Sequence, residues 1–371
     1  SGAFNTASIV GTTAASASAC GDLAGQATAG ITLKKAWNHG KTDDALSLAI
    51  SGSGVTGAVG GSSVVGGASV DATATATVGS TVAIAEGWTA GDSANYDVAY
   101  SCDNGIGAAT SFTMPNAAVT CTVTNSRKSA QLRLAKQWIN GTSGDSINLT
   151  ASYNGTTASV VSTAGSTDKT DTGTNTATVY AGDVLTVPEE VFTNPDNAAK
   201  YTKTVSCSAG SLAGRDLTVP AGTAELLCTY KNSGLPRVLA TKAAEPAAFI
   251  KGASGQKYVI TVTVAGAPTT DMITIADALP SGIKLAGAPT VEAGTGTSVP
   301  KLEACGAAGD TSLGAGCALS GSTAVALNLG TYIITIPVDT SDATVGATAG
   351  TNTAHLSGGG DPACKLDGKT F

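Results

Sequence analysis

The sequence ITLKKAW at residues 31–37 returns about one hundred residues later as LRLAKQW at residues 132–138. In both copies every second residue is large and mostly apolar, which is the period of a β-strand with one buried face. Each copy continues into a Gly/Asp turn and a further alternating segment, residues 46–48 or 147–149. A self-match with this period predicts two related all-β domains.

The far ends of the two copies also match. YSC at 100–102 corresponds to VSC at 205–207, and VTCTVTN at 119–125 corresponds to LLCTYKN at 226–232. Short alternating segments with turn residues between them are typical of a β-sandwich. We therefore predict β-sandwiches over 31–128 and 130–234, and a third all-β domain of a different type over 236–371.

The composition argues against several classes of function. The formal net charge is −7, which argues against a nucleic-acid partner, and no apolar run is long enough for a membrane span. There are only two histidines and no recognisable catalytic or metal-binding motif. We predict a protein that is not an enzyme and has neither metal nor cofactor. Aromatic residues make up only 4%, so we expect lean cores that need covalent reinforcement.

Eight cysteines lie in strand-like sequence without any Cys-x-x-Cys pair. This pattern favours disulfides formed in an oxidising compartment over a zinc site. Cys20 and Cys364 remain, and could bond within one chain or between chains. The predicted disulfides are Cys102–Cys121, Cys207–Cys228 and Cys305–Cys317.

One polar residue in each opening strand falls on the apolar face: Lys35 shares it with Leu33 and Trp37, and Lys136 lies at the matching place in the second copy. Each lysine must either reach solvent at the sheet end or be neutralised inside. The closing strands place Asn125 and Asn232 on their inward faces.

A glutamate follows alternating apolar residues in the middle of each copy, Glu86 in the first and Glu189 in the second. Lysine, glutamate and asparagine meeting in an apolar site is an arrangement for a spontaneous Lys–Asn isopeptide bond. Burial favours the neutral amine, and the carboxyl group moves protons. The alternative is a lysine whose head reaches water, with the asparagine capping a turn.

Residues 31–234 resemble the prealbumin-like (CnaB/SpaA-type) modules of bacterial pilins and adhesins. The Leu-x-Lys-x-Trp strand, the mid-domain glutamate and the closing Cys-Thr-Val-Thr-Asn carry this resemblance. It implies two autocatalytic triads, the first with Lys35, Glu86 and Asn125 and the second with Lys136, Glu189 and Asn232. The cysteine pair in each copy departs from the family pattern, and could take the place of the bond.

Residues 236–371 resemble the immunoglobulin-like conserved-repeat domain of long bacterial surface proteins. Three features carry the match: alternating Tyr258, Ile260 and Val262, the segment DALPSGI at 277–283, and TNTA at 351–354. The positions of Lys242 and Asn352 suggest a third isopeptide bond between strands.

The N-terminal sequence NTASIVG at 5–11 echoes NTAHLSG at 352–358, and a cysteine follows each copy. Three interpretations remain open for residues 1–30. They are the end of a domain in a longer tandem array, a flexible linker, or a strand donated to the third domain of a neighbouring subunit. The donor strand would contain Asn5, Thr6, Ala7 and Ile9.

These observations predict a structural subunit of an extracellular bacterial fibre or surface layer, built from tandem immunoglobulin-like and prealbumin-like β-sandwiches. We expect it to self-associate into a polymer or array at the cell surface. The alternative is a stalk segment of a large adhesin, and the sequence identifies no ligand for it.

Overall fold

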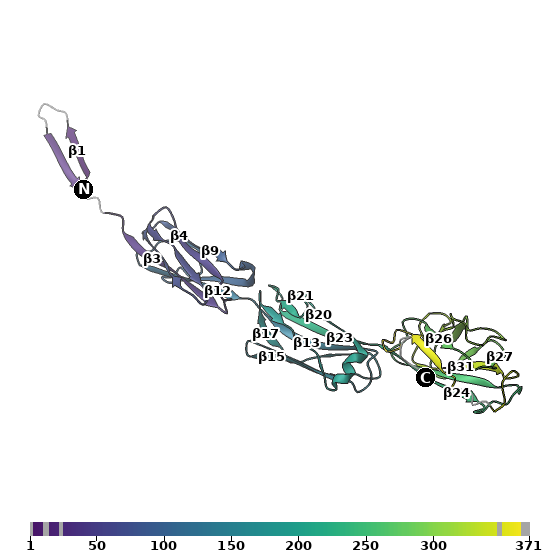
Figure 1. The fold of residues 1–371 in the computed structure, drawn as a ribbon. Coiled ribbons are helices and arrows are strands. Elements are labelled where there is room, and N and C mark those ends of the chain that lie inside the picture. Colours follow the sequence, from purple (N-terminus) through teal and green to yellow (C-terminus); the bar gives the residue numbers. More distant parts are fainter. Residues whose placement is uncertain (1–2, 10–14, 22–24, 347–350, 365–371) are drawn as a thin grey trace. The chain divides into compact units, whose positions relative to one another are not determined.

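The computed structural model describes residues 3–9, 15–21, 25–346 and 351–364, with the backbone alone for the first two ranges. These residues form strands, turns and two short 3₁₀ helices (Figure 1). They group into two compact units. The first contains the described residues of 1–131, 178–186 and 209–225, and the second contains the other described residues. The predicted all-β fold of tandem β-sandwiches is confirmed.

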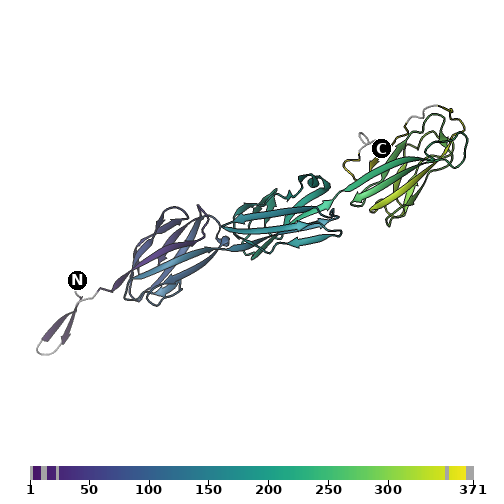
Figure 2. The same cartoon turned by 90° about the horizontal axis from the view of Figure 1, so that it is seen from below.

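The first sandwich consists of two five-stranded sheets (Figures 1 and 2, purple to blue). One sheet has the order β10 (Tyr96–Cys102), β12 (Val119–Arg127), β3 (Thr28–Asn38), β8 (Ala72–Thr77) and β5 (Val55–Val59). The other has the order β11 (Ser111–Thr113), β9 (Thr81–Ala90), β4 (Ala45–Ser51), β6 (Gly61–Val64) and β7 (Ser69–Val70). Leu33 and Val123 from one sheet and Leu48 and Ile84 from the other pack into a single core.

The opening and closing strands of this sandwich are direct neighbours. β3 pairs with β12 in parallel, in a register that runs from Ile31 opposite Val119 to Asn38 opposite Ser126. This confirms the predicted neighbourhood of the two strands, on which the predicted Lys35–Asn125 contact depends.

The second copy repeats this arrangement with shorter outer strands. β16 (Lys169–Thr172), β13 (Ser129–Ile139), β23 (Glu225–Gly234) and β20 (Tyr201–Cys207) form one sheet, and β17 (Ala177–Tyr180) also pairs with β13. β15 (Thr156–Thr163), β14 (Ser146–Tyr153) and β19 (Val191–Phe192) form another. Trp138 from β13 packs edge-on against Phe192 from β19, so these two sheets share a core. The first unit also contains the sheet β18 (Val184–Thr186), β22 (Asp216–Thr218), β21 (Ser211–Ala213).

A third pair of sheets lies in the C-terminal part of the second unit. One contains β24 (Pro236–Glu245), β25 (Lys257–Gly266), β31 (Gly330–Asp339) and β27 (Lys284–Leu285), with β28 (Thr290–Ala293) also on β31. The other has the order β29 (Pro300–Glu303), β30 (Ala318–Gly321), β26 (Ile273–Asp277), β32 (Ala354–Gly358). Ile260 and Tyr332 of the first sheet share one core with Ile275 and Leu356 of the second.

The predicted N-terminal strand is present as β1 (Ala3–Ile9), which contains Asn5, Thr6, Ala7 and Ile9. It pairs antiparallel with β2 (Ala15–Gly21) in a two-stranded sheet. Residues 10 and 11 of the echoed sequence lie outside the described residues.

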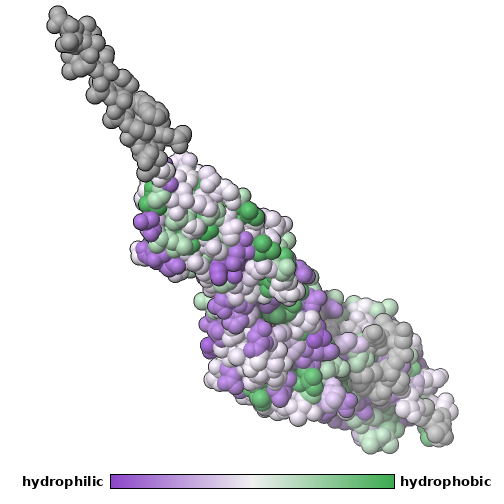
Figure 3. Space-filling view, turned by 90° about the vertical axis from the view of Figure 1, so that its left-hand side faces the viewer, coloured by the Kyte–Doolittle hydropathy of each residue, from purple (hydrophilic) through white to green (hydrophobic). Residues whose placement is uncertain are grey.

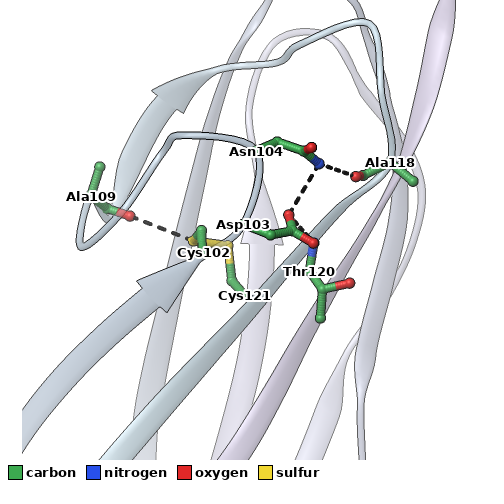
Figure 4. Close-up of a disulfide and its surroundings, with 7 residues drawn as sticks. All are labelled: Cys102, Asp103, Asn104, Ala109, Ala118, Thr120 and Cys121. Atoms are coloured by element: carbon green, nitrogen blue, oxygen red, sulfur yellow. Dashed lines mark hydrogen bonds between the residues drawn. A yellow bond between two sulfur atoms is a disulfide. The ribbon is translucent and has the colours of Figure 1, made fainter.

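All three predicted disulfides are present: Cys102–Cys121, Cys207–Cys228 and Cys305–Cys317. The first joins directly opposed residues of β10 and β12. Beside it, the Asp103 carboxylate accepts a hydrogen bond from the backbone nitrogen of Thr120 at 2.9 Å (Figure 4). The side chain of Cys364 is buried, and its Sγ donates to the Leu356 carbonyl at 3.4 Å. The side chain of Cys20 lies outside the described part of the chain.

Exposed large apolar residues are scattered over the surface. Figure 3 shows small apolar spots separated by polar residues on the face in view. Among the described residues, no helix is long and apolar enough to cross a membrane.

Candidate functional site

The first candidate site is built around Lys35, which β3 places on its inward face after Ile31 and Leu33. Asn125 lies on the neighbouring strand β12, where Val123 is directly opposite Lys35. Because strand residues alternate between faces, Asn125 follows Val123 on the same inward face, one diagonal step from Lys35. Asn125 is completely buried.

Glu86 completes this site from the facing sheet. It follows Val82 and Ile84 on the inward face of β9. Lys35 Nζ lies 3.0 Å from Glu86 Oε2, and Asn125 Nδ2 donates to Glu86 Oε1 at 3.1 Å. The side chains of Lys35 and Glu86 are 0% and 7% exposed, so the lysine head does not reach solvent. The structure thus brings together the three side chains predicted for the first copy.

The second site has the same composition with one correction. Lys136 Nζ lies 2.9 Å from Glu190 Oε1, and Asn232 Nδ2 donates to that same oxygen at 3.0 Å. Lys136 Nζ also donates to the Tyr230 carbonyl at 3.2 Å. The Lys136 side chain is 0% exposed and that of Glu190 is 6% exposed.

The acidic residue that contacts Lys136 is Glu190, not the predicted Glu189, which is exposed. The prediction extended the alternation of Leu185 and Val187 by one more step. However, β18 ends at Thr186, and Pro188 lacks the backbone N–H that a regular ladder would need. The strand period therefore stops applying before the glutamates are reached.

An aromatic ring lies beside each lysine head. The Lys35 ammonium nitrogen is 4.4 Å from the centre of the Trp37 ring, and the Lys136 nitrogen is 4.4 Å from that of Trp138. The tryptophan is two residues beyond the lysine on the same strand face, so the Lys-x-Trp pattern itself creates this contact. The rings help to exclude water from the amine while tolerating its charge.

Burial changes the acidity of both amines. It lowers the pKa of Lys35, although hydrogen bonding and charge attraction from Glu86 act in the opposite direction. In the second site burial lowers the pKa of Lys136 to about 8, again against Glu190. A fall from 10.5 to about 8 enlarges the neutral amine fraction at neutral pH by roughly 300-fold. A neutral amine is the nucleophilic form.

The side-chain amide of each asparagine makes only part of the hydrogen bonds that it could make. Among the described residues, Oδ1 of Asn125 and Oδ1 of Asn232 are buried without a hydrogen-bond partner. An unpaired buried acceptor costs about 1–3 kcal/mol. In both sites the amide therefore sits beside a buried amine and a carboxyl group, with its carbonyl oxygen open to a proton donor.

The C-terminal pair of sheets, which was predicted as a third domain, contains a related cluster. Lys242 Nζ, from β24, lies 2.6 Å from Asp277 Oδ2 at the end of β26, and the two side chains are 4% and 0% exposed. Asn352 lies two residues before Ala354, which is opposite Asp277 in the β26–β32 pair. Lys242 and Asn352 were predicted, but Asp277 was missed. Its signal is the alternation Ile273, Ile275, Asp277, which places the acid on the buried face.

A second polar network recurs in the first two copies. Tyr96 Oη donates to Asp44 Oδ2 at 2.5 Å, and Tyr201 Oη donates to Asp145 Oδ2 at 2.8 Å. Burial is the main cause that raises the pKa of each tyrosine to about 12. The hydrogen bond to the nearby aspartate also raises this pKa. These hydroxyl groups also accept from the backbone nitrogens of Lys41 and Thr142, so their role is to fix the turn after the opening strand.

The fold and the sites together define a class of chain: tandem disulfide-bonded β-sandwiches with a buried lysine, acid and asparagine in each. Among the residues that the structure describes, no group of three side chains could hold a metal ion. No protein-family model matches this sequence, and no curated protein matches it.

Comparison with solved structures identifies distant similarities. The chain is similar to the major pilin T-13 of Streptococcus pyogenes at 11% identity, over 57% of this chain and 98% of that one, with a TM-score of 0.27. It is similar to the Bacillus anthracis TIE protein at 9% identity, over 71% of this chain and 53% of that one (TM-score 0.23). The pilus adhesin SpaC of Lactobacillus rhamnosus GG in its open conformation matches at 12% identity, over 94% of this chain and 42% of that one (TM-score 0.23). At these TM-scores the likeness does not assign a function.

Proposed function

We propose that this chain is a structural subunit of an extracellular bacterial fibre or surface layer, in which Lys35–Asn125 and Lys136–Asn232 isopeptide bonds lock the first two sandwiches. The observation that carries the proposal is a repeated buried site in which one carboxyl group contacts both an amine and an amide. Three disulfides support an oxidising, extracellular location.

The chemistry of the bond follows from the contacts. The neutral lysine amine attacks Cγ of the asparagine, and the glutamic acid donates a proton toward the amide as charge develops on Oδ1. The new C–N bond forms, the Cγ–Nδ2 bond breaks, and ammonia leaves with the proton that the lysine gives up through the glutamate. No oxidant or cofactor is needed. The product is an uncharged amide that joins the first and last strands of the sandwich.

Intact-mass spectrometry of the denatured, fully reduced chain tests this part of the proposal. Each bond removes the mass of one ammonia molecule, and digestion should release branched peptides that link Lys35 to Asn125 and Lys136 to Asn232. Recovery of both lysines and both asparagines in unlinked peptides would refute the cross-links.

We further propose that subunits associate through strand donation, with β1 pairing to the third domain of a second copy. β32 ends its sheet, so within the described ranges its outer edge carries no neighbouring strand. Such an edge can accept a strand through backbone hydrogen bonds. Deletion of residues 1–12 should abolish ordered fibres in electron micrographs while leaving the monomer folded. Fibres that persist in the deletion variant would exclude this mode of assembly.

A further inference from the structure

The third domain contains a buried amide that ordinary packing does not explain. Nδ2 and Oδ1 of Asn352 are buried without a hydrogen bond of regular geometry among the described residues, and the same holds for Oδ1 of Asp277. Buried polar side chains nearly always find partners, and each exception requires a reason. The amide nevertheless lies close enough to Asp277 and Tyr258 for a weak side-chain hydrogen-bonding interaction, which lowers the pKa of both against the larger effect of burial; the contact is too poorly aligned to satisfy the amide.

Beside Asp277, with which this amide interacts, lies an amine that is positioned to exchange a proton with the acid. Lys242 Nζ is 2.6 Å from Asp277 Oδ2 and 4.5 Å from the centre of the Tyr258 ring. Burial lowers the pKa of Lys242 and raises the pKa of Asp277, so burial moves both groups toward their neutral forms. A neutral amine beside a neutral carboxylic acid is the reactive pair for amide exchange.

We infer that Lys242 and Asn352 form a third isopeptide bond, with Asp277 as the proton-transferring acid. The inference rests on the chemistry of the proposed function but on different elements. Here the lysine is on the sheet of β24 and the asparagine precedes β32 of the facing sheet, so the bond joins the two layers. Lys242 Nζ bonds to Asn352 Cγ, the Cγ–Nδ2 bond breaks, and ammonia leaves with the lysine proton passed on by Asp277.

The cavity next to the cluster fits this reaction. Asn352 and Tyr258 line a cavity of about 750 Å³ together with Ala244 and Ile283. The ammonia released from the amide therefore has space beside the carbon atom that it leaves. Formation of the bond also removes the unpaired Asn352 nitrogen from the buried site, because Nδ2 leaves as ammonia and Lys242 Nζ becomes the amide nitrogen.

Peptide mapping of the reduced, denatured full-length chain tests the inference. The expected result is a branched peptide that contains Lys242 and Asn352, with no tryptic cleavage after Lys242 and a mass lower by one ammonia. The Asp277→Asn and Lys242→Met variants should each regain one ammonia and lose this branched peptide. Lys257→Ala is the matched control, because Lys257 pairs with Glu245 on the exposed part of the same sheet. It should leave the mass deficit unchanged.

The outcomes separate this inference from the proposed function. Linked peptides at the first two sites with unlinked Lys242 and Asn352 would overturn the third bond alone. A linked Lys242–Asn352 peptide with unlinked first and second sites would support the third bond and remove the cross-links from the proposed function. If Asp277→Asn still forms the Lys242–Asn352 bond, the role assigned to Asp277 is refuted.

Discussion

Lys35 Nζ lies 3.0 Å from Glu86 Oε2, and both side chains are almost completely buried. A buried ion pair of this kind is weak support for stability, because desolvation of both charges offsets their attraction. The proposed conversion of the lysine to an amide would remove its charge altogether. We therefore interpret the pair as a reactive arrangement rather than as a stabilising salt bridge.

Replacing one glutamate of the Pro188-Glu189-Glu190 segment should abolish the second cross-link, while replacing its neighbour should not. Glu190→Gln removes the acid that contacts Lys136, so we expect the mass of one ammonia to return. Glu189→Gln alters an exposed side chain next to it and should keep the wild-type mass. Intact-mass measurement of both variants decides between the two residues. An unchanged mass for Glu190→Gln would contradict its assignment.

Loss of the second cross-link should have a large effect on stability. The Lys136→Met/Glu190→Gln double variant cannot form the bond and leaves no unpaired buried charge. By analogy with a disulfide that closes a loop of about one hundred residues, the free energy of unfolding should fall by about 4–5 kcal/mol.

Urea denaturation with the disulfides intact measures this change. Lys231→Met is the matched control, since Lys231 is an exposed lysine next to Asn232 on the same strand. It should change the free energy of unfolding by no more than about 0.5 kcal/mol. Equal effects of the double variant and the control would be incompatible with a cross-link.

The disulfides should stabilise the sandwiches independently of the proposed isopeptide bonds. The Cys207→Ser/Cys228→Ser variant opens a loop of 21 residues and should lose about 3 kcal/mol of unfolding free energy. Its mass deficit should remain that of the wild type, because neither cysteine contributes to the proton transfer. Disappearance of the Lys136–Asn232 peptide in this variant would show that the two kinds of cross-link are coupled.

A variant that lacks Asn232 cannot form the cross-link, so its stability should depend on pH through the lowered pKa of Lys136. In Asn232→Ala the amine persists, with a folded-state pKa of about 8 against 10.5 in the unfolded chain. Between these pH values the unfolded state holds a proton that the folded state has lost, so stability should rise with pH. The slope is at most about 1.4 kcal/mol per pH unit, and this contribution is flat below pH 8.

Thermal or urea unfolding of Asn232→Ala and of Asn232→Ala/Lys136→Met between pH 7 and pH 10.5 isolates this contribution. The difference between the two variants removes the titration of the groups that do not contact Lys136. The slope should be absent in the double variant. Parallel pH profiles would mean that burial does not depress the pKa of Lys136.

Much of the fold could be predicted because the sequence repeat gives the same pattern of strands twice, so each copy supports the assignment of the other. The inward position of Lys35 and Lys136 follows from strict alternation within long strands, β3 and β13. The disulfides follow from cysteines that occupy matching places in the last two long strands of each copy.

The remaining errors occur where a strand ends. Glu190 could not be chosen over Glu189 by alternation, because Pro188 interrupts the strand between the apolar residues and the acids. Asp277 was visible as an alternating residue, but its partner Lys242 lies on the other sheet, and no local pattern reports contacts across a sandwich. The Tyr96–Asp44 and Tyr201–Asp145 contacts join residues more than fifty positions apart, and only their repetition could have suggested them.

The parallel pairing of β3 and β12 determines how the first sandwich responds to mechanical force. The chain enters at the start of β3 and leaves at the end of β12, which are opposite ends of the paired region, so traction loads the whole row of interstrand hydrogen bonds in shear. A bond from Lys35 to Asn125 would keep the segment between them out of the stretched path. At about 3.5 Å per residue, and with the Cys102–Cys121 disulfide intact, that segment would otherwise lengthen the tether by roughly 250 Å. The domain would then be almost inextensible without having to be exceptionally stable.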